Sequence, residues 1–196
     1  VAIFRWHIKN PTKTEREISL LFSFQSIFGS KQNIFYQENG FCGIVFDNLH
    51  GEKNYKYGQM GMFVQTDDVK VTCLNAFGEN GDGKEVWDTF SKDGMLEDTI
   101  LKEDHYSHLT NSPGAICAKA KLQPGQDKVV TFVLAWDFPV LDTVYKTKWY
   151  KKYTNFFGKD GRNVGKIARK AFSNQERWLV DIEKWQDKYL KLDKPD

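Results

Sequence analysis

The stretch that decides the fold is AICAKAKLQPGQDKVVTFVLAW, residues 115–136. Its two ends, Ala115–Leu122 and Lys128–Trp136, are short apolar runs bounded by turn residues, a pattern typical of buried strands. Gln123-Pro124-Gly125-Gln126 separates them. Because proline and glycine suit the two central positions of a type II turn, the stretch predicts a β-hairpin.

Further strands are predicted on the N-terminal side of this hairpin. Ala2, Phe4, Trp6 and Ile8 occupy alternate positions, and the same period of two recurs over residues 18–25, beyond a turn at Asn10-Pro11-Thr12-Lys13. Three more runs are strand candidates: Phe41–Asp47, Gln59–Thr66 and Val69–Phe77. Short strands separated by turns favour a sandwich over a parallel α/β sheet. We therefore predict a mainly β fold, an antiparallel β-sandwich over residues 1–140, followed by a long C-terminal helix.

A polar, glycine-rich region, Asn80–Asn111, interrupts the strand pattern. We interpret it as a long insertion with one short helix around Glu85–Phe90. His105 and His108 have the i, i+3 spacing of two metal ligands on a helix, but no third ligand is indicated, so a solvated loop is the better interpretation. We predict no metal site.

Acidic pairs do not predict a catalytic centre. Asp67-Asp68 and Glu97-Asp98 are adjacent in sequence, and adjacent residues of a strand point to opposite faces. A retaining glycosidase needs two carboxyl groups about 5–5.5 Å apart. Asp82-Gly83 lacks the ligand spacing of a calcium loop. All three pairs are interpreted as turn residues.

The end of the chain predicts one long helix over residues 162–192. Residues spaced by steps of three and four are apolar there, at Val164, Ala168, Ala171, Trp178, Ile182, Trp185 and Tyr189, with Gln175 the one polar member of the series. A helix of about 28 residues is roughly 40 Å long. Two interpretations remain open: the helix folds back over its own sandwich, or its apolar face packs against another partner.

The segment before this helix, residues 141–161, is basic and aromatic. It contains YKTKWYKKYTNFF, residues 145–157, and the wider range 141–172 holds nine Lys or Arg against two Asp. Since the whole chain has a net charge of +2, this range carries +7 and the remainder −5. Basic residues interleaved with aromatic residues are suited to binding single-stranded nucleic acid or an anionic lipid surface. We favour a linker whose aromatic residues pack on a neighbouring domain while its lysines face water.

The amino-acid composition indicates the general class of protein to which the chain belongs. The 196 residues fit one domain, and 15 Phe, 8 Tyr and 6 Trp make low-hydrophobicity disorder improbable. The odd set Cys42, Cys73 and Cys117 lies in apolar runs without a CxxC pair, which predicts buried thiols in a reducing, cytoplasmic compartment. No run reaches the roughly 18 apolar residues of a membrane span. No signal peptide is visible, although Val1 is not a natural start, so an upstream segment removed by processing is compatible with the sequence.

The residues themselves name no reaction, because the sequence lacks GxSxG, P-loop, HExxH and GxGxxG motifs. Four segments nevertheless resemble, in order and spacing, the N-terminal domain of glycoside hydrolase family 116, which includes the non-lysosomal glucosylceramidase or bile acid β-glucosidase. They are WDTFSKDG at 87–94, LAWDFP at 134–139, YTNFFG at 153–158, and Trp178 through Ile182 to Trp185-Gln186.

The resemblance implies a β-sandwich joined to a C-terminal (α/α)6 barrel that hydrolyses β-glucosides, including glucosylceramide, with retention of configuration. The catalytic glutamate and aspartate of the family lie in that barrel. No catalytic residue is therefore carried over to this chain, no cofactor is implied, and the chain alone is expected to be inactive. The helix at 162–192 becomes a connector toward the barrel, which binds most of the substrate.

The resemblance also implies a set of contacts with the barrel. The residues expected there are Trp136, Asp137, Trp149, Tyr153, Phe156, Phe157, Trp178 and Trp185. The family domain starts upstream of Val1, so the sandwich is expected to be incomplete and to expose strand edges prone to association. The alternative function is a free-standing module that binds carbohydrate or an anionic surface through Trp149 and Lys151, with peripheral membrane contact. Nucleic acid is not expected as a partner.

Overall fold

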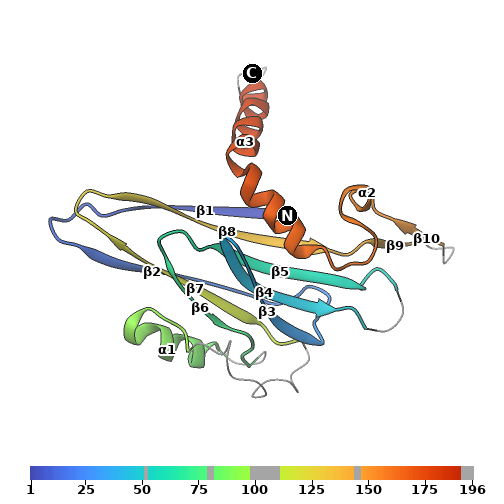
Figure 1. The fold of residues 1–196 in the computed structure, drawn as a ribbon, viewed down its shortest axis with the longest axis horizontal. Coiled ribbons are helices and arrows are strands. Elements are labelled where there is room, and N and C mark those ends of the chain that lie inside the picture. Colours follow the sequence, from blue (N-terminus) through green and yellow to red (C-terminus); the bar gives the residue numbers. More distant parts are fainter. Residues whose placement is uncertain (51–52, 79–81, 98–110, 144–146, 191–196) are drawn as a thin grey trace, which may run out of the picture.

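The computed structural model describes residues 1–50, 53–78, 82–97, 111–143 and 147–190. Ten strands and three helices follow one another along these ranges (Figure 1). The strands are β1 (Ala2–Lys9), β2 (Arg16–Phe24), β3 (Gln32–Glu38), β4 (Phe41–Asn48), β5 (Gly58–Gln65), β6 (Lys70–Leu74), β7 (Gly114–Leu122), β8 (Asp127–Asp137), β9 (Val140–Asp142) and β10 (Lys148–Tyr150). The helices are α1 (Lys84–Asp93), α2 (Thr154–Phe157) and α3 (Val164–Leu190).

The strands form an antiparallel sandwich, as the alternation of apolar residues predicts. A five-stranded sheet has the order β1-β8-β5-β4-β3, and a three-stranded sheet has the order β2-β7-β6. Strands β9 and β10 make a separate two-stranded ribbon. The predicted mainly β fold with a long C-terminal helix is therefore confirmed. Strand β3 was not predicted, because its short run QNIFYQE begins and ends with polar residues.

The predicted hairpin at 115–136 is wrong in its pairing. The turn itself forms, with Gly125 at φ 75° and the amide of Gln126 donating to the carbonyl of Gln123 at 3.0 Å. However, β7 pairs with β2 and β6, whereas β8 pairs with β1 and β5. The turn therefore carries the chain from one sheet to the other as an arch.

A second arch, between β1 and β2, lies beside the first at the same end of the sandwich (Figure 1). Hydrogen bonds of Asn10 join the two arches. Its amide donates to the carbonyl of Gln126 at 3.0 Å, and its own carbonyl accepts from Gly125 at 2.8 Å. Its side-chain amide donates to the carbonyls of Leu122 at 3.0 Å and Gln123 at 3.2 Å. This asparagine is only 1% exposed, so its polar atoms depend on these partners.

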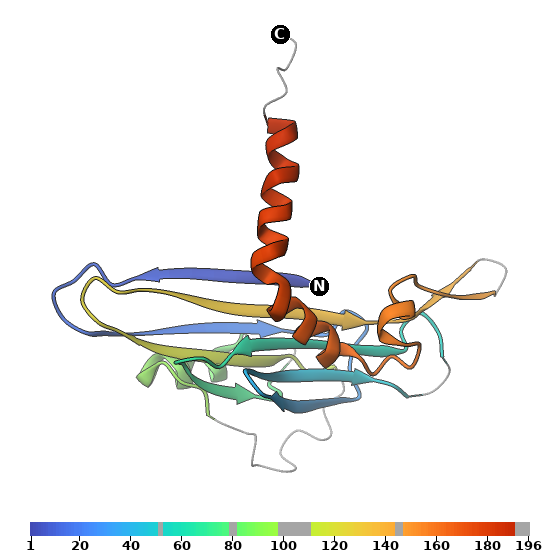
Figure 2. The same cartoon turned by 45° about the horizontal axis from the view of Figure 1, so that its top comes forward.

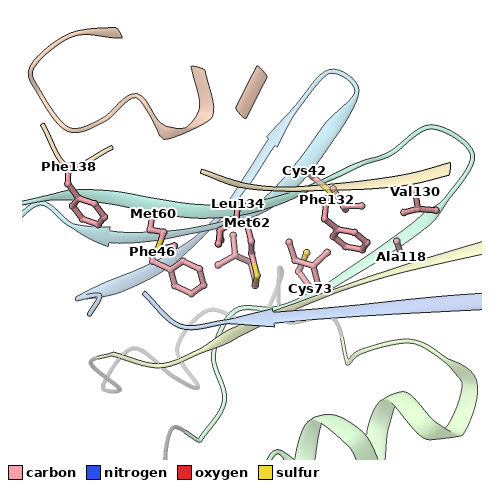
Figure 3. Close-up of a cluster of buried hydrophobic side chains, with 13 residues drawn as sticks. Cys42, Phe46, Met60, Met62, Cys73, Ala118, Val130, Phe132, Leu134 and Phe138 are labelled. Atoms are coloured by element: carbon pink, nitrogen blue, oxygen red, sulfur yellow. The ribbon is translucent and has the colours of Figure 1, made fainter. Parts of the chain in front are cut away.

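The main core lies between the two sheets (Figure 3). Phe46, Met62 and Phe132 come from the five-stranded sheet, while Cys73 and Ile116 come from the three-stranded sheet. A second cluster lies on the outer face of the five-stranded sheet under α3, and a third lies under α1. Each sheet face therefore has a helix or a sheet against at least part of it.

The insertion contains the predicted short helix as α1, which packs Val86 and Phe90 against the outer face of the three-stranded sheet. His105, His108 and Asp98 lie outside the described residues. Asp67 and Asp68 form an exposed turn, with Asp68 at φ 54°. Asp82 and Gly83 precede α1, and the Asp82 carboxylate accepts from the amide of Lys84 at 2.9 Å.

Candidate interdomain interface

Helix α3 has two halves that differ in their surroundings. Its first half lies on the outer face of the five-stranded sheet, where Val164, Ile167, Ala168 and Ala171 are buried. They pack against a group of sheet residues that includes Phe41, Val45, Phe63, Val133 and Ala135. The second half leaves the sheet and projects from the sandwich (Figure 2). The first interpretation of the long helix therefore holds for its first half, which covers its own sandwich. The second half is not covered by the sandwich, and its packing against another partner stays a prediction.

The first turn of α3 approaches β3 very closely. A Cβ atom added to Gly165 would lie 2.3 Å from the hydroxyl oxygen of Tyr36 and 2.4 Å from its ring carbon Cζ. Tyr36 is held in place because its ring packs on Phe41 and Phe63 and its hydroxyl donates to Glu38 at 2.9 Å. Residue 165 is thus a glycine because there is no room for a Cβ atom beside Tyr36, and not because the backbone has an unusual angle.

Asp137, at the end of β8, fixes the start of α3. Its carboxylate accepts from the hydroxyl of Tyr153 at 2.8 Å and from the backbone amide of Asn163 at 2.8 Å. The side-chain amide of Asn163 also donates to it at 3.1 Å. The carbonyl of Asn163 then accepts the amide of Ile167 at 2.9 Å, which opens the helix. Burial, and next the hydrogen bond to Asp137, raise the pKa of the Tyr153 hydroxyl above its ordinary value.

Polar contacts on both flanks of α3 complete its attachment. Arg169 donates to the carboxylate of Glu38, and this hydrogen bond is the main cause that holds the pKa of Glu38 below its ordinary value. Gln175 accepts from the hydroxyl of Thr131 at 3.1 Å. Arg5 pairs with Glu176 at 2.6 Å. The attachment ends at about this point of the helix.

Beyond Trp178 the same helix face continues without a hydrophobic partner from the described part of the sandwich. Trp178 is half-buried at the edge of the sheet cluster. Ile182, Trp185 and Tyr189 follow at helical spacing and are 51%, 58% and 58% exposed. The rings of Trp185 and Tyr189 lie 5.0 Å apart. Trp178, Asp181, Ile182 and Trp185 line a shallow, open groove. We call residues 178, 182, 185 and 189 the apolar stripe.

A second set of exposed apolar residues lies on the ribbon and on α2. Leu141 is directly opposite Trp149 in the β9–β10 pairing, and the two side chains are 52% and 62% exposed. Phe156 of α2 is 82% exposed. Lys159 lies over the ring of Tyr150, 4.8 Å from its centroid. The described part of the range 141–161 thus contains strand β10 and a helical turn, and Leu141, Trp149, Tyr150 and Phe156 are exposed there.

The eight residues expected to contact a barrel fall into three groups. Trp136, Trp149, Phe156 and Trp185 are exposed. Tyr153, Phe157 and Trp178 are partly buried in the cluster under α3. Asp137 is fully buried and works inside the chain as the anchor of α3.

Leu141 and Tyr189 were not among the expected contact residues. The helical spacing from Trp185 could have identified Tyr189. Leu141 required the strand register, which the sequence does not show.

The described part of the chain shows few other groups that could bind a metal ion or act as a nucleophile. There, no group of three or more His, Cys, Asp or Glu side chains is arranged to hold a metal ion. The three cysteines are buried and form no disulfide. Burial raises the pKa of the Cys117 thiol to about 11, and this thiol donates to the carbonyl of Gly94 at 3.1 Å. A thiol with so high a pKa is a poor nucleophile.

No described helix combines the length and the apolar composition that a membrane crossing needs. A family model described as beta-glucosidase 2, glycosyl-hydrolase family 116 N-term, matches residues 1–178 of the 196. The match extends from the first strand through the docked half of α3.

Proposed function

The chain belongs to the family of N-terminal domains of glycoside hydrolase family 116, and from this premise we propose that it braces the catalytic domain of a retaining β-glucosidase. The observation that carries the proposal is the apolar stripe on the projecting half of α3. Exposed aromatic residues at helical spacing are typical of a surface that another domain covers. The partner is a C-terminal (α/α)6 barrel, which supplies the catalytic carboxyl groups and binds most of the substrate.

The proposal divides the chain into three parts. Residues 1–140 form the sandwich, 141–161 the basic and aromatic linker, and 162–192 the connector helix. Trp136, Trp149 and Phe156 contact the barrel together with the apolar stripe, near the rim of the substrate cleft. Glucosylceramide and related β-glucosides are the proposed substrates of the whole enzyme. Three buried cysteines without a disulfide favour a reducing, cytoplasmic location.

The proposal is tested by comparing two faces of α3. Ile182→Ser alters the apolar stripe, whereas Val180→Ser removes a similar side chain, 45% exposed, from the opposite face. In the β-glucosidase that carries this domain, Ile182→Ser should lower the midpoint of thermal inactivation by several degrees. Val180→Ser should leave that midpoint unchanged. Equal effects of the two substitutions would contradict the proposed interface.

A second assay addresses catalysis. The chain 1–196 should not hydrolyse a chromogenic β-glucoside, while the enzyme with its barrel should. Turnover by the chain alone, retained after repurification, would show that the family assignment misplaces the catalytic groups.

A second candidate function is a module that binds carbohydrate or the surface of an anionic membrane. The exposed Leu141–Trp149 pair beside a lysine-rich segment is the observation that favours it. The chain should then bind anionic liposomes or glycan in a sedimentation assay, and the Trp149→Ser, Lys151→Ser double variant should bind much less. Unchanged binding by the variant would remove this candidate.

A further inference from the structure

One buried carboxylate connects two helices that are separated in the sequence. Asp137, at the end of β8, is fully buried. Its Oδ1 atom accepts from the hydroxyl of Tyr153, the N-cap residue of α2, at 2.8 Å. Its Oδ2 atom accepts at 2.8 Å from the backbone amide of Asn163, 26 residues further along the chain, where α3 begins. The two oxygen atoms of one side chain thus hold α2 and α3 to the same strand.

The β9–β10 ribbon is attached to the same end of β8 (Figure 1). The backbone amide of Lys151 donates to the carbonyl of Pro139 at 2.9 Å. The amide and the hydroxyl of Thr154, in the first turn of α2, donate to the carbonyl of Lys151 at 3.0 Å and 2.7 Å. Lys151 therefore joins the end of the ribbon to α2, and a movement of α2 displaces the ribbon with it.

The turn that enters α3 packs directly on the sheet beside Asp137. A Cβ atom added to Gly161 would lie 3.1 Å from the Cα atom of Gly58, the first residue of β5. A Cβ atom added to Gly58 would lie 2.0 Å from the carbonyl oxygen of Asp137. Three segments of backbone therefore meet without room for a side chain between them, and the hydrogen bonds of Asp137 have little freedom to rearrange.

A carboxylate is suited to this position because both of its oxygen atoms accept hydrogen bonds, whereas an asparagine side chain accepts on one oxygen atom only. The donors are the hydroxyl of Tyr153 and the backbone and side-chain amides of Asn163, all of them uncharged. Burial of a charged carboxylate is unfavourable unless hydrogen bonds stabilise the charge. The connection is therefore sensitive to the loss of a single donor.

The elements joined at Asp137 carry two separate exposed apolar surfaces. One consists of Leu141 and Trp149 on the ribbon and Phe156 on α2. The other is the apolar stripe of α3. Two contacts held rigidly relative to each other bind one partner more tightly than two independent contacts, because the second forms with little further loss of freedom.

We propose that Asp137 is a positioning residue of the interdomain interface. It keeps the ribbon and α2 at a fixed position relative to α3, so that both exposed surfaces meet the barrel together. The identity of the partner rests on the proposed bracing function. The connection between α2 and α3 rests on the hydrogen bonds of Asp137 and can be measured in the chain by itself.

Amide hydrogen exchange of the chain, measured by NMR, tests the connection. Tyr153→Phe removes the hydroxyl that donates to Asp137 and keeps the ring. The amide of Gly158, which donates to the carbonyl of Thr154 at 2.9 Å, should exchange about tenfold faster or more, the factor expected for one hydrogen bond to a charged group. The amide of Ile167 in α3 should exchange as before. Asp137→Ala removes both connections, so both amides should exchange faster.

Tyr150→Phe is the matched control, because Tyr150 is a tyrosine of the ribbon that is 46% exposed. It should leave the exchange of Gly158 unchanged. If Tyr153→Phe had no more effect than Tyr150→Phe, Asp137 would not hold α2 and the proposal would be overturned. This comparison decides the matter even where Asp137→Ala does not fold.

The second test compares the chain 1–196 with the β-glucosidase that carries it. Tyr153→Phe should lower the midpoint of thermal unfolding by several degrees more in the enzyme than in the chain alone, because only the interface requires α2 and α3 in a fixed relation. Equal shifts would overturn the positioning role. A failure of the bracing function gives a different result: Ile182→Ser and Val180→Ser would then shift the enzyme equally, whereas the hydrogen-exchange result would stand.

Discussion

At the scale of single residues, Asn10 is the polar group on which the sandwich depends most. Its side-chain oxygen accepts from the hydroxyl of Thr12 at 2.7 Å. Its side-chain amide donates to the carbonyl of Thr14 in the β1–β2 arch at 2.8 Å and to the carbonyls of Leu122 and Gln123 in the other arch. Asn10→Ala leaves the buried carbonyl of Leu122 without this side-chain donor, whereas the carbonyl of Gln123 keeps its bond from the amide of Gln126. We expect the free energy of unfolding to fall by about 2–3 kcal/mol, the usual cost of such unpaired groups. Urea denaturation measures it.

The control for this prediction is Asn155→Ala. Asn155 is exposed, so the change should stay within about 0.5 kcal/mol, as for most surface substitutions. Similar losses in the two variants would show that Asn10 does not hold the arches together.

Glu38 makes a residue-scale prediction about pH. Its pKa is lowered in the folded chain, first because Arg169 donates to its carboxylate. A carboxyl group whose pKa is lower folded than unfolded stabilises the protein above its ordinary pKa, and this contribution is lost as the pH falls through the folded pKa. The stability of the chain should therefore fall on acidification below about pH 4.5. In Glu38→Gln the fall should be shallower.

Thermal melts between pH 7 and pH 3 measure this effect, with the exposed Glu183→Gln variant as control. The slope should not vanish in Glu38→Gln, because the pKa values of Glu17 and Asp160 are lowered as well. Identical slopes for the native chain and Glu38→Gln would mean that the Arg169 contact does not contribute.

At the scale of elements, Gly165 decides how α3 lies on the sheet. Alanine would favour the helix by about 1 kcal/mol on propensity alone. Its Cβ would nevertheless meet the hydroxyl of Tyr36 at 2.3 Å, and crowding in a packed site costs typically about 1–3 kcal/mol. Tyr36 is fixed by Glu38 and by two aromatic rings, so it cannot move aside cheaply. We expect Gly165→Ala to lower the free energy of unfolding.

Ser173→Ala provides the comparison, because Ser173 is exposed on the same helix. It should be neutral or slightly stabilising by propensity. Chemical denaturation of both variants checks the pair. A Gly165→Ala chain as stable as Ser173→Ala would show that the helix shifts freely on the sheet.

The elements also show what the sequence could and could not predict. Alternation identified β1 and β2, further strand candidates coincided with β4 and β5, and the proline–glycine turn was placed correctly at 124–125. Two apolar runs separated by a proline–glycine turn can form a hairpin within one sheet or an arch between two sheets. Partner choice is decided by long-range packing, here by β2 and β6 on either side of β7. Local sequence therefore predicted the turn but not the pairing across it.

The same limit applies to the candidate interface. The sequence showed one apolar face from Val164 to Tyr189, with Gln175 as its one polar member. It could not show where the sheet beneath that face ends, because this depends on the twist of the sheet and the tilt of the helix. In the structure the change comes between Phe172, which packs on Phe41, and Ile182, which is exposed. Which aromatic residues remain uncovered is thus a property of the tertiary arrangement.

At the scale of the whole molecule, stability should reside in the sandwich and the docked half of α3. A chain ending at Val180 keeps all the buried helix residues from Val164 to Ala171. It loses only side chains that are exposed or lie outside the described residues. We therefore expect the free energy of unfolding in urea to change by less than about 1 kcal/mol, because little apolar surface is buried there.

A chain ending at Asn163 gives the contrast. It removes Ile167, Ala168 and Ala171 from the sheet and uncovers Phe63 and Val133, whose burial each contributes roughly 1.5–3 kcal/mol. This chain should unfold at much lower urea concentration or fail to fold. The chain ending at Val180 should also be more soluble than the full chain, since it lacks Ile182, Trp185 and Tyr189. Strong destabilisation of the chain ending at Val180 would mean that the projecting half of α3 packs against its own sandwich. The apolar stripe would then not be the surface that another domain covers.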